Sequence, residues 1–258
     1  MKTLFSTIAL AFGLMHTIFG GTAFAREAVP VEAKNVVLVH GAWADGSSWS
    51  DVIPYLGAAG LKVIAVQNPL TSLADDVAAT KRALALLDGP TVLVGHSYAG
   101  SVISEAGGEP KVTALVYVAA RAPDAGEDFL ALGSQFPTMP LRAGVEKHNG
   151  YLTVSEKAFF NHFADGIPME KAKTLYSVQQ PVAANLFADR TTTAAWKTKP
   201  SWYVVAKNDN TISPDFQRFL AGRMKAKTIE VESGHLPLVS HPKDIAALIL
   251  AAAGKRGL

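Results

Sequence analysis

The sequence contains no cysteine among its 258 residues. A disulfide framework and a thiolate metal site are therefore both excluded. An excess of charge is also lacking, since 24 Lys and Arg residues face 22 Asp and Glu residues and the net charge is +2. The basic residues are scattered along the chain. This composition argues against nucleic acid or an anionic surface as a partner, because both bind through concentrated positive charge.

One long apolar run lies at the N-terminus and has no counterpart later in the chain. Lys2 precedes an interrupted apolar stretch over residues 4–19, and residues 23–25 (AFA) form a small-residue cleavage pattern. This arrangement is typical of a secretory signal peptide. The stretch is short for the ~20 apolar residues of a transmembrane helix. We expect residues 1–25 to be removed on export to a periplasm or the medium, without a stable membrane anchor, and residues 26–258 to form one domain.

Six short segments have the pattern of buried β-strands. Most are continuous apolar runs rich in β-branched residues, as in parallel strands that are covered on both faces. The last of them alternates, with Ile229 and Val231 on one side, so we expect it near the edge of the sheet. The six segments are residues 35–39, 62–66, 91–94, 114–118, 202–205 and 227–232.

Helical patterns separate these strands. Residues 72–87 carry apolar side chains at helical spacing, with Ser72 as the N-cap. Ser213 and Pro214 have the form of a cap followed by proline at the first helical position. The helical segments are residues 51–59, 72–87, 214–224 and 242–253. The alternation predicts an α/β fold with a mostly parallel, twisted sheet flanked by helices and joined by right-handed crossovers.

The alternation of strand and helix stops between about residues 123 and 200. This stretch has no convincing strand, and short helical patterns occupy residues 155–163 and 169–178. A long insertion within a compact domain usually has structure or a function of its own. We therefore predict a mostly helical cap over the C-terminal edge of the sheet. Phe159, Phe160 and Phe163 suggest an apolar pocket beneath it, although packing within the cap is the better expectation for at least two of them.

The segment Gly95–Gly100 (GHSYAG) is the strongest local motif. It directly follows a predicted strand and precedes a helical pattern. A serine in such a sharp strand-to-helix turn projects its hydroxyl above the sheet, and small neighbours let the backbones approach. Gly95 meets this need, while Ala99 stands where the usual pattern has glycine. Ser97 is the candidate nucleophile; the alternative is a capping serine in an ordinary glycine-rich turn.

A serine hydroxyl needs a base in order to act as a nucleophile at neutral pH. Among seven histidines, His235 lies in the loop after the last predicted strand, at the edge where open α/β sheets build their sites. His96 adjoins Ser97 but should point away from the turn. His241 precedes Pro242 and suits the entry to a helix. We predict His235 as the base.

The base must be oriented by an acid. Asp209 lies in the loop after the fifth predicted strand, again at its C-terminal end. The competing carboxylate is Asp215, which fits better in the first turn of a helix, where an acid favours the helix dipole. Asp209 could also be a turn-forming residue. The order Ser97, Asp209, His235 places each group after a separate strand and predicts a catalytic triad.

Two backbone amides are expected to hold a developing oxyanion. One is the amide of Tyr98, the residue after the nucleophile. The other is the amide of Ala42 in the first loop, where Gly41 lets the backbone curl. Of the nearby tryptophans, Trp43 suits a wall or the core, and Trp49 suits the core.

Taken together, these motifs resemble the α/β-hydrolase superfamily. The likeness rests on residues 37–43 (VLVHGAW), on residues 95–100 and on Gly234-His235, and it spans about residues 35–253. It is strongest to bacterial esterases of the group that also contains plant hydroxynitrile lyases and methyl-ester-cleaving plant esterases. The resemblance implies an α/β-hydrolase fold with a cap and a triad of Ser97, Asp209 and His235.

The resemblance also implies a reaction. In the lyases a lysine follows the catalytic histidine and a threonine follows the histidine of the first loop, but here these positions are Leu236 and Gly41. Related dehalogenases and epoxide hydrolases use an aspartate where this chain has Ser97. We therefore expect a serine hydrolase of small to medium apolar or aromatic esters that needs no metal or organic cofactor. The alternatives are the same triad acting on a thioester, amide, peracid or C–C bond, and a non-catalytic small-ligand-binding protein.

Overall fold

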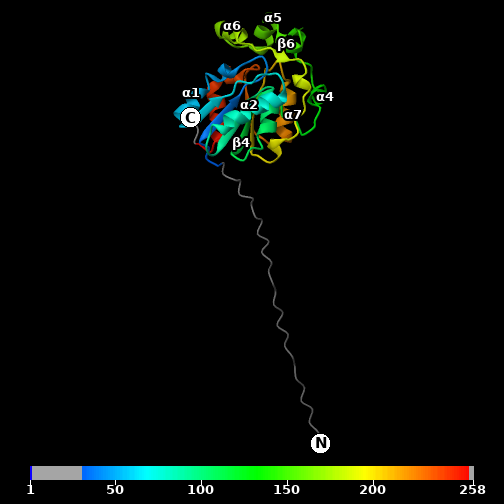
Figure 1. Cartoon of the computed structure of the whole chain (residues 1–258). Coiled ribbons are helices and arrows are strands. Elements are labelled where there is room, and N and C mark those ends of the chain that lie inside the picture. The colour runs from blue at the N-terminus through cyan, green and yellow to red at the C-terminus, as the bar shows by residue number, and fades with distance from the viewer. Residues whose placement is uncertain (2–30, 256–258) are drawn as a thin grey trace.

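A six-stranded sheet forms the centre of the molecule, in a computed structural model that describes Met1 and residues 31–255 (Figure 1). The strand order is β2-β1-β3-β4-β8-β9, and every neighbouring pair is parallel. All six predicted strands are present, and the alternating one is at the edge. They are β1 (Asn35–Val39), β2 (Lys62–Ala65), β3 (Thr91–His96), β4 (Val112–Val118), β8 (Ser201–Ala206) and β9 (Lys227–Val231). Apart from Met1, the expected signal peptide, residues 1–25, lies outside the described residues.

Helices cover both faces of this sheet, and β1, β3 and β8 are therefore buried at every residue. α2 packs against α3, and α1 packs against α9. The Ser72 side chain caps α2 as predicted, whereas the side chain of Ser213 makes no capping hydrogen bond to α7. The helices are α1 (Ile53–Ala58), α2 (Leu73–Ala85), α3 (Ala99–Ala106), α7 (Pro214–Arg223), α8 (Pro237–Ser240) and α9 (Pro242–Ala252).

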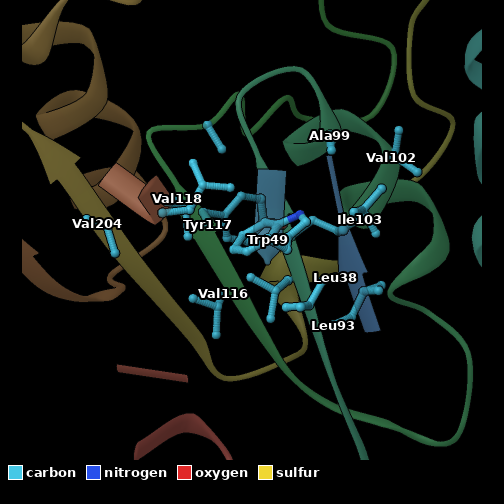
Figure 2. Packing of buried hydrophobic residues seen from close by; sticks show 14 of the residues in the cluster. Leu38, Trp49, Leu93, Ala99, Val102, Ile103, Val116, Tyr117, Val118 and Val204 are labelled. Atoms are coloured by element: carbon cyan, nitrogen blue, oxygen red, sulfur yellow. The ribbon is translucent and has the colours of Figure 1, made fainter. Parts of the chain in front are cut away.

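The hydrophobic core lies between the sheet and these helices. Leu38, Leu93 and Val116 come from three neighbouring strands and share one cluster with α3 (Figure 2). Trp49, in a 3-10 helix over Gly46–Trp49, is fully buried in this cluster, as expected. This core holds the C-terminal ends of the strands in a fixed order, and the loops that leave those ends carry the predicted site residues.

The stretch from residue 123 to 200 differs from the sequence prediction in one respect. Besides short helices it contains an antiparallel three-stranded sheet in the order β5-β6-β7. Its strands are two to four residues long and only partly buried, so they lack the buried apolar pattern. The missed signal is the Asn149-Gly150 pair, whose φ angles of 47° and 86° close a tight β5–β6 hairpin.

Of the elements in this stretch, α5, α6 and β6 lie together at one end of the molecule, and α4 lies apart from them along its side (Figure 1). The full set is α4 (Phe129–Gly133), η2 (Pro140–Gly144), β5 (Val145–His148), β6 (Tyr151–Val154), α5 (Glu156–Ala158), η3 (Phe159–Phe163), α6 (Met169–Ser177), β7 (Val182–Ala183), η4 (Leu186–Ala188) and η5 (Ala195–Lys197). Within the part of the chain that the structure describes, no helix has both the length and the apolar character to span a bilayer.

Candidate active site

Ser97 lies in a tight turn between β3 and α3. Its φ angle is +55°, a conformation that L residues rarely adopt. The turn is held by backbone bonds: the Ser97 N–H donates to the Val118 carbonyl at 3.1 Å, and the Ser97 carbonyl accepts from the Arg121 N–H at 2.9 Å. A Cβ at Gly95 would lie 2.7 Å from the Ala99 carbonyl oxygen, and one at Gly100 would lie 1.8 Å from that of Arg121. Glycine is therefore required on both sides of the turn.

The structure brings Ser97, His235 and Asp209 into one hydrogen-bonded chain. His235 Nε2 lies 2.8 Å from Ser97 Oγ, and His235 Nδ1 lies 2.8 Å from Asp209 Oδ2. The three side chains are buried, and Ser97 lines a cavity. Each follows a different strand, β3, β8 or β9, so the parallel order of the sheet places them together.

Asp209 fixes the tautomer of the histidine. Its Oδ1 accepts the N–H groups of Thr211 (2.7 Å) and Ile212 (3.0 Å), and its Oδ2 accepts the Gln217 amide N–H (2.7 Å) as well as the His235 ring. An ionised carboxylate only accepts hydrogen bonds, so the neutral ring carries its proton on Nδ1. Nε2 is then free to accept the Ser97 hydroxyl proton.

The competing carboxylate lies elsewhere. The side chain of Asp215 is 71% exposed in the first turn of α7 and pairs with Arg218 at 3.0 Å. The polar partner that sequence reasoning missed is Gln217, two residues further along the same helix and fully buried. A glutamine in an amphipathic helix carries no sequence signal of such a role.

His96 supports the base without touching the nucleophile. Its ring Nε2 lies 2.8 Å from the His235 carbonyl oxygen, to which it donates, and the two rings are 4.9 Å apart. Burial, followed by the neighbouring His235, holds the pKa of His96 well below its usual value, so the ring is neutral. The prediction that His96 points away from Ser97 left out this contact with the catalytic loop.

The two expected oxyanion donors flank Ser97. Ala42 and Tyr98 both line the cavity that Ser97 lines, and neither backbone N–H donates to a protein acceptor within residues 31–255. His40 fixes the first loop, because its Nε2 accepts the Asn68 N–H and its Nδ1 therefore donates to the Gly41 carbonyl at 2.8 Å.

Position 41 can hold no side chain in this arrangement. A Cβ on Gly41 would lie 2.8 Å from the Cβ of Ser97 and 3.1 Å from the His96 carbonyl oxygen. The threonine of the lyases therefore has no room beside the nucleophile. Leu236, which stands where the lyases have lysine, is buried.

The cavity beside Ser97 has a volume of about 610 Å³ and mostly apolar walls. Its aromatic lining consists of Trp43, Tyr98, Phe129, Phe136, Phe187 and Phe216. The suggestion that Phe159, Phe160 and Phe163 form an apolar pocket is wrong, because none of them lines this cavity. The expectation that at least two of them pack within the cap is confirmed, since their rings contact one another. Phe163 nevertheless lies 5.2 Å from the His235 ring.

No group of three or more His, Asp or Glu side chains among residues 31–255 is arranged to hold a metal ion.

The sequence and the fold of this chain are similar to those of known proteins. Residues 36–248 match the sequence model of the alpha/beta hydrolase family. A carbendazim-hydrolyzing esterase of Nocardioides is 31% identical over 51% of this chain and 64% of its own length. Methylesterase 8 of Arabidopsis thaliana is 25% identical over 86% of this chain and 90% of its own. The solved structure of a pyrethroid hydrolase from Sphingobium faniae superimposes with a TM-score of 0.71 at 20% identity, covering 86% of this chain and 97% of that one.

Proposed function

Since this chain belongs to the alpha/beta hydrolase family, we propose that it is a serine hydrolase that cleaves carboxylic esters through an acyl-enzyme on Ser97. The observation that carries the proposal is the unbroken chain of hydrogen bonds from Ser97 through His235 to Asp209, with 2.8 Å at both links. A nucleophile, its base and an orienting acid are in contact beside an apolar cavity.

In the first half of the reaction, Ser97 Oγ attacks the ester carbonyl carbon while His235 Nε2 takes the hydroxyl proton. The carbonyl oxygen becomes an oxyanion, which accepts hydrogen bonds from the amides of Ala42 and Tyr98. Asp209 stabilises the imidazolium that forms. When the intermediate collapses, the ester C–O bond breaks and His235 returns the proton to the leaving alcohol.

In the second half, water attacks the acyl-enzyme. His235 removes a proton from the water as its oxygen bonds to the acyl carbon, and the same two amides hold the second oxyanion. Collapse breaks the bond to Ser97 Oγ, which takes back the proton, and the carboxylic acid leaves.

The cavity supports a preference for small to medium apolar or aromatic esters. Trp43 is part of its wall, and the indole N–H donates to the Leu152 carbonyl at 3.2 Å, so the wall is tied to the cap. Two relatives are named as a carbendazim-hydrolyzing esterase and a methylesterase, and both names agree with ester substrates. The blocked position 41 favours hydrolysis over cyanogenic lyase chemistry.

Export of the protein is a separate proposal, which rests on the pattern of residues 1–25 alone. N-terminal sequencing of protein recovered from outside a bacterial cytoplasm should begin at Arg26. An intact N-terminus on that material would contradict the cleavage.

Turnover of p-nitrophenyl butyrate tests the proposed function. Ser97→Ala and His235→Ala should each lower kcat by about 10⁴- to 10⁶-fold, because the two groups act as a unit. The matched control is Ser101→Ala, one turn further along α3, whose buried hydroxyl makes no hydrogen bond within the described residues. Loss of turnover in the control, or its survival in Ser97→Ala, would contradict the assignment.

A further inference from the structure

Two arginine side chains line the cavity beside Ser97. Arg121 follows β4 and is 5% exposed, while Arg142 lies in η2 and is exposed. Of the described residues that line the cavity, none is Asp or Glu. The cavity therefore combines an apolar wall with positive charge, and no acidic side chain within it compensates that charge.

Arg121 is held rigidly at both ends. Its backbone N–H donates to the Ser97 carbonyl at 2.9 Å, so the residue is attached to the nucleophile turn. At the other end, guanidinium Nη2 donates to the Phe187 carbonyl at 3.3 Å, and the guanidinium carbon lies 4.3 Å from the centroid of the Phe129 ring. Phe129 and Phe187 both line the cavity, so the guanidinium is part of its wall.

Two nitrogens of the guanidinium make no hydrogen bond to the described part of the protein. Nε is buried and makes no hydrogen bond within residues 31–255. Nη1 makes no hydrogen bond within these residues either. Unlike Nε it is not fully buried, and because Arg121 lines the cavity it can meet a ligand there. Burial is costly for a polar group whose hydrogen bonds are not replaced.

Nearby carboxylates attract Arg121, but none of those described forms an ion pair with it. Glu127 is engaged by two hydrogen bonds of 2.8 Å from Arg223, and Asp189 Oδ2 accepts the Leu73 N–H at 2.9 Å. Neither forms an ion pair with Arg121 in the described part of the chain. Burial lowers the pKa of Arg121 to about 10, which still leaves it charged at neutral pH. A buried, unpaired cation is strongly unfavourable without an anionic partner.

We propose that Arg121 binds a carboxylate of the substrate, so that the preferred ester carries a free carboxylate at one end and the scissile bond at the other. This inference rests on the proposed esterase function. A guanidinium presents a planar fork of N–H donors that matches a carboxylate. Trp43 and Phe129 hold the apolar body between the two ends, and exposed Arg142 adds positive potential that attracts the anion.

A matched pair of esters tests this recognition. Monobenzyl succinate has a free carboxylate, and benzyl methyl succinate replaces it with a neutral ester of nearly equal size. Release of benzyl alcohol gives kcat/KM for each. Wild type should prefer the half-ester by about 10- to 100-fold, the range expected for a hydrogen-bonded charge in a desolvated site.

Arg121→Met, which keeps the apolar stem, should bring the two kcat/KM values to about the same level. Arg121→Lys should retain part of the preference, because the charge remains without the fork. Arg142→Gln should reduce the preference less than Arg121→Met. The control Arg82→Gln removes the charge of an exposed side chain on α2, which does not line the cavity. This variant should leave the preference unchanged.

Calorimetric binding to the Ser97→Ala protein separates recognition from catalysis. Tighter binding of monobenzyl succinate than of benzyl methyl succinate, lost on adding Arg121→Met, supports the anion site even if wild type cleaves neither ester. Equal binding and equal turnover of the two esters would overturn the proposal, and this comparison needs no folded Arg121 variant. A preference that persists in folded Arg121→Met, verified by thermal unfolding, would also overturn it.

Discussion

The catalytic triad and the surroundings of the cavity treat polar groups in opposite ways. In the triad, both oxygens of Asp209 accept two hydrogen bonds each, and both nitrogens of His235 have partners. In the cavity wall, Arg121 Nε is buried without a hydrogen bond among residues 31–255, and the same holds for Asp76 Oδ2, which lies outside the cavity lining. The hydrogen bonds of the catalytic groups are therefore all made without substrate, whereas polar atoms around the cavity remain without a hydrogen-bond partner in the described part of the chain.

This difference separates two tasks. A triad must be preorganised, because displacement by about 1 Å can lower the rate about 100-fold. A recognition site gains most when its unpaired groups meet the ligand that completes them, since a wrong ligand then leaves them unsatisfied. The contrast predicts that substitutions in the triad reduce turnover of every ester. Substitutions of the unsatisfied groups around it should act on substrate choice or stability.

The largest effect in this comparison should come from Asp209→Asn. The amide can present an N–H toward His235 Nδ1 and so favour the wrong tautomer, which should lower kcat by about 10³- to 10⁴-fold. Asp215→Asn, at the exposed start of α7, should leave kcat within about twofold of wild type. Steady-state kinetics on an aryl ester measures both. A larger loss in Asp215→Asn would assign the acid to that residue.

His96→Phe should have an intermediate effect. The change removes the hydrogen bond to the His235 carbonyl and loosens the loop that carries the base. We expect kcat to fall about 10- to 100-fold while KM changes little. His96→Gln, whose amide N–H can donate to the same carbonyl, should recover part of kcat. A rise in KM at constant kcat would show that His96 acts on substrate binding instead.

Asp76→Asn should affect stability more than turnover. Asp76 is fully buried, its Oδ1 accepts the Leu70 N–H at 2.8 Å, and burial raises its pKa from 3.8 to about 6. A raised carboxyl pKa means that the folded state favours the protonated form. The stabilising contribution is complete below about pH 4 and is lost as the pH rises to about 6.

The asparagine variant should therefore gain stability over wild type as the pH increases. Between pH 4 and pH 7.5, the difference in unfolding free energy between variant and wild type should move in favour of the variant by up to about 3 kcal/mol. Urea unfolding at the two pH values measures it. A difference that stays constant with pH would show that Asp76 does not titrate in this range.

The sequence predicts the sheet well because buried parallel strands leave an unmistakable apolar pattern. Residues 35–39 have that pattern, whereas the edge segment 227–232 alternates instead, and the sheet order then determines which loop ends meet. The positions of Ser97, Asp209 and His235 follow from the same logic, since each comes directly after a strand.

The cavity wall was harder to predict. Phe159 and Phe163 are as apolar as Phe129 and Phe216, and only the three-dimensional packing decides which pair faces the cavity. Arg121 gives no sequence signal either, because a lone arginine after a strand is usually exposed. Its burial depends on contacts with α4 and with η4, and the contact with η4 is 66 residues away in sequence.

The most direct test of the central claim is the location of a covalent adduct. Wild-type protein is treated with a fluorophosphonate and digested with trypsin, and residues 83–111 should form the peptide that carries Ser97. The account predicts one phosphonyl group, on Ser97, and none when His235 is replaced by alanine over the same short exposure. Labelling of Ser101 or Ser104 instead, or equal labelling without the imidazole, would contradict it.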